Sequence, residues 1–120
     1  MGKEKSARAT WGGGMRFDVV TGSGHSLTLD TSELDGGGDA GPSPMDMLVI
    51  GLAGCTGMDV ISILTKMRQP VTGLEIAVHG VRVDEHPQVF QTITVEYTFT
   101  GQHLNAESVA RAIELSETKY

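Results

Sequence analysis

The only cysteine of the chain, Cys55, lies in the middle of a long apolar stretch. A thiol reacts as the thiolate, which burial opposes and a nearby cation favours. Of the arginines outside this stretch, Arg8, Arg16, Arg82 and Arg111, our preferred partner is Arg16, on the first predicted hairpin. A planar guanidinium suits both a thiolate and an oxygen-bearing substrate. On residue type alone, a lone cysteine on a buried helix is more often a small packed hydrophobe.

Two acids lie on the same predicted helix as Cys55. Asp59 follows Cys55 by one turn on the same face, so an ionised Asp59 would raise the pKa of the thiol. We therefore interpret Asp59 as a structural carboxylate that is hydrogen-bonded or paired. Asp46 stands at the helix start, where it serves as a capping residue by default. It becomes a candidate active-site acid if the helix N-terminus opens onto a pocket.

Other sequence patterns do not point to a cofactor or a metal. Four histidines are scattered without ligand spacing, and a single cysteine leaves no zinc set; they are His25, His79, His86 and His103. The glycine-rich stretches 22–24 and 36–38 do not join a strand to a helix as phosphate loops do. We expect no cofactor, and no Gly-x-Ser-x-Gly elbow is present.

Composition predicts one globular domain over residues 1–120. Hydrophobic residues make up 39% and charged residues 20%, and the formal net charge is −6, so we expect neither nucleic acid nor an anionic membrane surface as a partner. With one cysteine and no secretory leader in the sequence, we expect a cytoplasmic protein. The apolar stretch 47–64 contains Asp59, which would cost about 2.5–3.5 kcal/mol at a bilayer centre. We interpret the stretch as a buried helix.

The signals at both ends of this stretch predict a helix from Pro44 to Met67. Ser43 can cap it, Pro44 suits its first position, and Pro70 ends it. Its apolar residues surround the helix on all sides, which predicts enclosure on every side. A chain of this length can hardly enclose such a helix alone, so we expect a homodimer in which two copies share a centre.

The remaining elements alternate strands and loops. We expect a flexible N-terminal segment 1–14, a hairpin of strands 17–20 and 27–29, and a mobile surface loop over 31–41. Strands are predicted at 74–83 and 92–100, with a turn at 84–88 and a bulge near Gly80. A second helix is predicted after an Asn105 cap, with an inner face of Val109, Ala112, Ile113 and Ser116.

The chain resembles the OsmC/Ohr family (osmotically inducible protein C and organic hydroperoxide resistance), and most closely its YhfA-like branch. The resemblance covers nearly the whole chain in order, and its most specific part is the motif around Cys55. It is carried by residues 42–47, 53–64 and 66–68, with Gly24, His25, Arg82, Pro87, 109–112, Leu115, Ser116, Lys119 and Tyr120.

The resemblance implies an α+β fold in which antiparallel sheets wrap a long central helix in an intertwined homodimer. It also implies a thiol-dependent peroxidase active in oxidative-stress defence, with Cys55 at the peroxidatic position. The substrate would be an organic hydroperoxide, and an external thiol or dithiol would be the reductant. Arg16 and Asp46 are the other candidate catalytic residues.

Three positions depart from the family pattern. Met45 stands where hydroperoxide-resistance members carry a glutamate, and Arg16 only approximately matches their catalytic arginine. Their resolving cysteine and final strand normally follow the Lys-Tyr pair, here Lys119 and Tyr120, so we expect a C-terminally truncated chain. The alternative function is a non-catalytic dimer that binds an apolar small molecule at its interface. A third possibility is aggregation through an open sheet edge.

Overall fold

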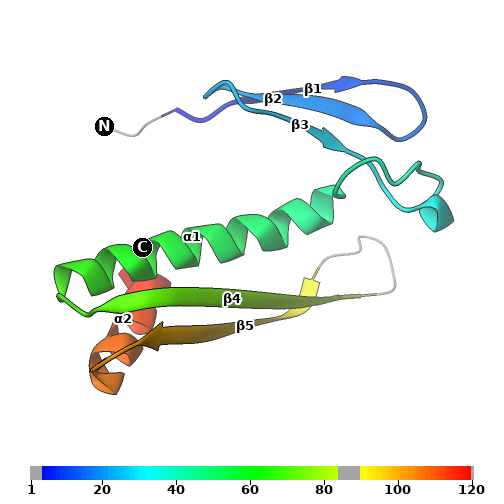
Figure 1. Ribbon diagram of the computed structural model, residues 1–120. Helices are drawn as coiled ribbons and strands as arrows, with labels where there is room; N and C mark the ends of the chain where they lie inside the picture. The colour runs from blue at the N-terminus through cyan, green and yellow to red at the C-terminus, as the bar shows by residue number, and fades with distance from the viewer. Residues whose placement is uncertain (1–3, 84–89, 120) are drawn as a thin grey trace. The chain divides into compact units, whose positions relative to one another are not determined.

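A computed structural model describes residues 4–83 and 90–119 of the chain. Figure 1 shows two helices and two antiparallel sheets, which confirms the predicted α+β class. The chain divides into two compact units, Met1–Leu48 and Val49–Tyr120, called here the N-terminal and C-terminal units. The elements are β1 (Ala7–Trp11), β2 (Phe17–Thr21), β3 (Ser26–Leu29), a 3-10 turn η1 (Glu33–Asp35), α1 (Pro44–Lys66), β4 (Val71–Arg82), β5 (Phe90–Gly101) and α2 (Ala106–Lys119).

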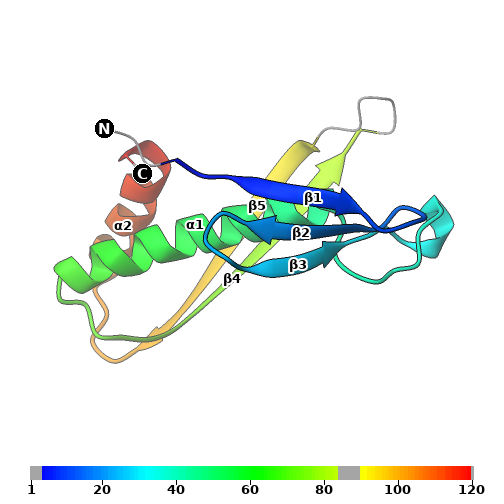
Figure 2. The same cartoon turned by 90° about the horizontal axis from the view of Figure 1, so that it is seen from above.

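The N-terminal unit contains the sheet β1-β2-β3, seen face-on in Figure 2. Strands β2 and β3 confirm the predicted hairpin, with Phe17 opposite Leu29. The prediction that no element precedes residue 14 is wrong, because β1 pairs with β2 from Ala7 opposite Thr21 to Trp11 opposite Phe17. All five residues of β1 are exposed. This strand is therefore held by its backbone ladder and carries no alternation of buried and exposed positions.

Helix α1 confirms the predicted helix to within one residue at its C-terminal end. Its start is a complete capping box. The Asp46 N–H donates to Ser43 Oγ at 3.0 Å, and the Ser43 N–H donates to Asp46 Oδ2 at 3.0 Å. At the other end Arg68 takes a positive φ of 57°, and the Gln69 N–H donates to the Leu64 carbonyl at 2.9 Å. This closing turn ends the helix before Pro70.

The second sheet is the long two-stranded ribbon β4–β5 in the C-terminal unit (Figure 1). The predicted bulge is displaced by one residue, since Gly80 itself pairs with Ile93 and a register shift lies between Val81 and Arg82. A second register shift lies between Val71 and Gly73. A Cβ at Gly80 would collide with the ring of Phe90, so this glycine makes room for an aromatic side chain. The predicted turn at 84–88 lies outside the described residues.

The hydrophobic core of the C-terminal unit joins both helices to the ribbon. Helix α2 begins at the predicted cap, where the Ser108 N–H donates to Asn105 Oδ1 at 3.0 Å. Its predicted inner face is confirmed, with Ala112 and Ser116 buried. The buried cluster consists of Val60, Ile63, Leu64 and Ala112, and the partly buried residues packed on it are Met67, Val71, Leu74, Tyr97, Phe99, Val109, Ile113 and Leu115.

Much of α1 is not covered in the single chain. The single chain does not enclose the helix, as expected for a chain of this length, because the core of the C-terminal unit uses only the face that carries Val60, Ile63 and Leu64. Enclosure by a second copy stays a prediction. By length and composition α1 could cross a membrane, since an 18-residue window has a mean hydropathy of 2.0 and only 17% of it is buried. Core helices of soluble proteins pass the same test, so this property alone does not place α1 in a bilayer.

Leu64→Ala is expected to lower the free energy of unfolding by about 2–5 kcal/mol, because it removes a fully buried side chain and leaves a cavity. Leu64 is 1% exposed, whereas Leu34 is 99% exposed. Leu34→Ala is therefore the matched control and should change stability by less than about 0.5 kcal/mol. Denaturant unfolding of both variants measures the difference. Equal midpoints would contradict the position of Leu64 in the core.

Candidate functional site

Cys55 is a free thiol on α1, and its side chain is exposed in the single chain. Helix α1 is regular from the capping box to Cys55, so helical hydrogen bonds fix the backbone at this residue. Three turns separate Cys55 from the helix start, beyond the range over which the helix dipole stabilises an anion. A reactive thiolate at this position therefore needs a cationic side chain from another part of the protein.

An open apolar groove runs between α1 and β4 within the C-terminal unit, and Cys55 is not among its lining residues. It is lined by Ala53, Gly54, Gly57, Met58 and Ile61 of α1 and by Leu74 and Ile76 of β4. Gly54 precedes Cys55 directly, and Met58 follows it by three residues, which makes it a neighbour on the helix surface. A Cβ at Gly57 would meet Ile76 Cδ1 at 3.0 Å. The groove has the chemistry to hold an apolar organic group on the face of α1 next to the one that carries Cys55.

Asp59 is partly buried, and no hydrogen bond or ion pair involves its carboxylate within the described residues. The interpretation of Asp59 as a hydrogen-bonded or paired carboxylate concerns a helix packed against its mate, so it stays a prediction. The side chain is on the part of α1 that the core leaves uncovered, where water can solvate it. A structural role for this carboxylate would require a partner from outside the chain.

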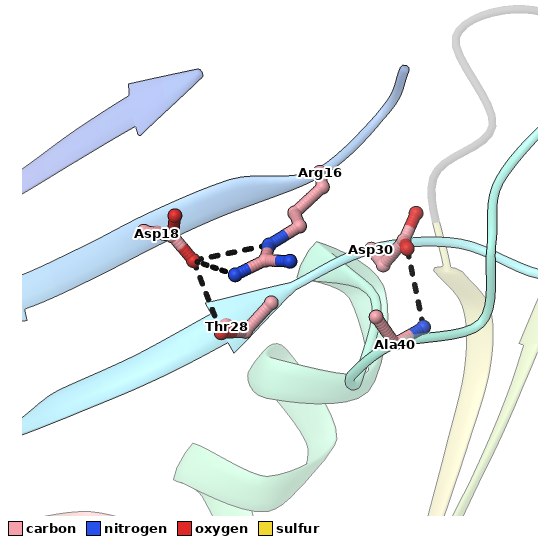
Figure 3. Close-up of polar contacts among 5 residues, drawn as sticks. All are labelled: Arg16, Asp18, Thr28, Asp30 and Ala40. Carbon is pink, nitrogen blue, oxygen red and sulfur yellow. Dashed lines mark hydrogen bonds and ion pairs between the residues drawn. The ribbon is translucent and has the colours of Figure 1, made fainter. Parts of the chain in front are cut away.

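Arg16 is held by a carboxylate on its own strand. Its Nε and Nη2 donate to Asp18 Oδ1 at 3.2 and 3.1 Å, and Thr28 Oγ1 donates to the same oxygen at 3.2 Å (Figure 3). The two charged side chains are 49% and 52% exposed. A solvent-exposed pair of this kind contributes only about 0.2–1 kcal/mol. Arg16 can therefore exchange Asp18 for another anion at little cost.

Asp46 acts as the capping acid of α1 and is exposed. Its carboxylate accepts from the Ser43 N–H, so the default interpretation from the sequence is confirmed. Arg16 and Asp46 belong to the N-terminal unit and Cys55 to the C-terminal unit. Arg16 and Asp46 thus share a unit that does not contain Cys55, and no hydrogen bond or ion pair joins them within the described residues.

Asp30, which the sequence analysis missed, is the most elaborately bonded carboxylate of the N-terminal unit. Only 5% of it is exposed, and the N–H groups of Thr31, Gly38 and Ala40 all donate to its oxygens at 2.8 to 3.3 Å. The expectation that 31–41 cannot order itself is thus wrong, because this segment is ordered by one carboxylate rather than by apolar burial. An aspartate that ends a strand before a glycine-rich segment is the signal that could have revealed it.

Hydrogen bonds to the charged form lower the pKa of Asp30. The N–H of Thr31 contributes most, followed by that of Ala40; burial opposes them, and the N–H of Gly38 and the nearby Arg16 charge add to the lowering. The pKa of Asp30 in the folded chain is therefore below its ordinary value of 3.8.

This lowered pKa predicts how the loop responds to acid. Because the pKa is depressed on folding, the contribution of Asp30 to stability is fully present above pH 3.8. It is lost as the pH falls through the folded pKa. The amide proton shift of Ala40, followed by NMR, should stay constant from neutral pH down to about pH 4 and move only below it. A midpoint of this shift change at or above pH 3.8 would contradict hydrogen bonding of the Asp30 carboxylate to the segment.

Within residues 4–83 and 90–119 the structure contains no group of three His, Cys, Asp or Glu side chains that could hold a metal ion. The candidate residues Cys55, Arg16 and Asp46 offer a thiol, a guanidinium and a carboxylate. Of these groups, only the Cys55 sulfur is a nucleophile that peroxides can oxidise.

Comparisons with known proteins point to a single family. The family model described as OsmC-like protein matches residues 36–119. Protein YhfA of Escherichia coli K12 is 39% identical over 114 residues, which cover 95% of this chain and 82% of that protein. These matches confirm the resemblance that the motif around Cys55 predicted.

Solved structures share the fold. A hypothetical protein from Aquifex aeolicus VF5 superposes with a TM-score of 0.85 at 28% identity, covering 98% of this chain and 82% of that one. An organic hydroperoxide resistance protein OsmC from Legionella pneumophila superposes with a TM-score of 0.72 at 17% identity, covering 95% and 82%; this likeness concerns the fold alone. Together with the family match, these findings show that the chain belongs to the OsmC/Ohr family.

Proposed function

We propose that this chain is a thiol-dependent peroxidase that reduces organic hydroperoxides through Cys55 and acts in the cytoplasm in oxidative-stress defence. The observations that support this most are the exposed free thiol of Cys55 and an open apolar groove on the neighbouring face of α1. Membership of a family that includes a protein described as an organic hydroperoxide resistance protein agrees with it. The groove would bind the organic group, and the thiol would face the peroxide.

The proposed reaction transfers one oxygen atom to sulfur. The Cys55 thiolate forms a bond to the distal peroxide oxygen, the O–O bond breaks, and the alkoxide leaves and takes a proton from water to become the alcohol. Cys55 becomes a sulfenic acid. An external thiol then condenses with it to a mixed disulfide and water, and a second thiol releases Cys55. A dithiol can supply both equivalents, so the single cysteine of these 120 residues is sufficient for turnover.

Arg16 is proposed to stabilise the Cys55 thiolate and the departing alkoxide. Its guanidinium is permanently charged and presents several N–H donors, and its exposed pair with Asp18 is easily exchanged for another anion. Asp46 is proposed to orient this arginine, since the glutamate of the family pattern is replaced by Met45 and Asp46 is the next acid along the chain. Both assignments belong to the proposal.

A homodimer is also part of this proposal. The uncovered apolar side chains of α1 include Ile50, Met58 and Ile61. Burial against the same helix of a second copy would remove them from water. The arginine could then come from either copy.

A second candidate function is the binding of an apolar small molecule without catalysis. The groove between α1 and β4 favours it, because its lining consists of apolar side chains and glycines. In that case Cys55 would pack against a ligand, and peroxide would oxidise it no faster than an ordinary free thiol.

One experiment separates the two candidates. The purified chain is treated with cumene hydroperoxide in the presence of dimedone, which traps sulfenic acids, and its intact mass is followed with time. One dimedone adduct, formed much faster than on free cysteine at the same pH, supports the peroxidase. An unlabelled chain, or labelling at the rate of free cysteine, would reject the peroxidase and favour the binding protein.

A further inference from the structure

Asp30 ties both ends of the segment 31–42 to one residue at the end of β3. Figure 3 shows its Oδ2 accepting from the Ala40 N–H, at 3.1 Å. Its Oδ1 accepts from the Thr31 N–H at 2.8 Å. Its own N–H donates to the Pro42 carbonyl at 3.1 Å. Both ends of the segment are therefore hydrogen-bonded to the same residue.

The returning end of this segment leads directly into α1. Pro42 precedes Ser43, the first residue of the capping box that contains Asp46. The chain also passes close to β3 here, since a Cβ at Gly41 would collide with the Thr28 carbonyl. The position of the helix start relative to the sheet is thus set over a few residues, with Asp30 at their centre.

Arg16 and Asp30 stand at the same end of the ladder between β2 and β3. The last pair of this antiparallel ladder is Phe17 and Leu29; Arg16 directly precedes Phe17, and Asp30 directly follows Leu29. The positive charge of Arg16 acts on the Asp30 carboxylate, although its hydrogen bonds go to Asp18. Asp30 is therefore bonded to the segment that leads into the helix start, and the charge of the proposed catalytic arginine is the smallest of the influences on its carboxylate.

We propose that Asp30 is a positioning residue of the peroxidase site. It fixes the start of α1, which carries Asp46, relative to the beginning of β2, which Arg16 directly precedes. This inference rests on the proposed function. Its competitor is a merely structural role, in which Asp30 orders a surface loop without influence on Cys55. The two roles differ in whether the rate of Cys55 oxidation responds to Asp30.

Asp30→Asn tests the proposal, with Asp39→Asn as the matched control. In Asp30→Asn the amide keeps one acceptor oxygen but turns an NH₂ donor toward the Ala40 N–H. Asp39 is an exposed aspartate of the same loop, and its φ of 53° is one that asparagine adopts well. In Asp30→Asn, amide exchange at Gly38, Ala40 and Asp46 should accelerate at least about tenfold, because hydrogen bonds to a charged group are lost. Asp39→Asn should leave these rates unchanged.

The oxidation rate of Cys55 by cumene hydroperoxide separates positioning from simple loop ordering. Arg16→Met should slow it about 10²-fold, since it removes a preorganised charge. Asp30→Asn should slow it about tenfold alone and have little further effect in the Arg16→Met background, because residues that act through one group are not additive. A wild-type oxidation rate in a folded Asp30→Asn variant, or full additivity with Arg16→Met, would overturn the proposal.

Failure of the proposed function has a different signature. If the wild-type thiol shows no fast oxidation, the peroxidase is rejected, and amide exchange at Asp46 then decides for Asp30. Acceleration at Asp46 in Asp30→Asn supports Asp30 as the residue that fixes the helix start. Unchanged exchange at Asp46 overturns that role as well.

Discussion

Cys55→Ser is expected to lose all dimedone labelling after treatment with cumene hydroperoxide, and all hydroperoxide consumption above background in the presence of a dithiol. Serine has nearly the same shape, but its hydroxyl is not ionised at neutral pH and cannot be oxidised to a sulfenic acid that dimedone would trap. The exposed position of Cys55 on α1 makes the substitution mild for folding. The expected loss is therefore chemical, and an unchanged circular dichroism spectrum and melting temperature should accompany it.

The methionines require a control in this experiment. The chain has six of them, and Met58, on the lining of the groove, is 77% exposed. Peroxide converts methionine to the sulfoxide, which adds the same mass as a sulfenic acid. Met58→Leu should abolish none of the dimedone adduct, because sulfoxides do not react with dimedone. Labelling that survives in Cys55→Ser, or hydroperoxide consumption equal to that of the wild type, would refute Cys55 as the nucleophile.

Local signals in the sequence predicted the helices well. Ser43 and Asp46 form the expected capping box, and Asn105 caps α2 as expected. Such signals succeed because a cap is a contact between residues two or three positions apart. Strand β1 was missed because its five residues are exposed on both faces, and its stability comes from pairing with a distant strand. No local pattern carries that information.

The candidate site was predictable only in part, for a similar reason. Cys55 stands out by residue type, but the groove on the neighbouring face of α1 depends on Leu74 and Ile76 of β4, which tertiary packing brings to α1. Asp30 was hidden because its partners are backbone N–H groups up to ten residues away, and any residue except proline supplies such a donor. Gly80 shows a different difficulty. A glycine in a strand can mark either a bulge or a place where a neighbouring side chain needs space, and here that neighbour is Phe90.

Met58→Glu is expected to dissociate the proposed homodimer, and this is the second large effect. If two copies of α1 pack through their uncovered faces, a symmetric interface buries the new carboxylate twice. Each unpaired buried charge costs several kcal/mol, so the dissociation constant should rise at least about 10³-fold at roughly 1.4 kcal/mol per tenfold change. Sedimentation velocity over a range of concentrations measures it. Leu34→Glu, at a position that is 99% exposed, should leave the dimer intact.

Gly54→Ala gives a test in which the sign of the effect is decisive. A Cβ at Gly54 meets no atom within 4 Å in the single chain, so in a monomer the alanine should stabilise α1 by about 0.5–1 kcal/mol through its higher helix propensity. In a dimer with closely packed helices the added methyl would be overpacked, at a cost of about 1–3 kcal/mol. We expect weaker association together with a more stable dissociated chain. A wild-type protein that sediments as a monomer at all concentrations, or tighter association in Gly54→Ala, would refute an interface at this face of α1.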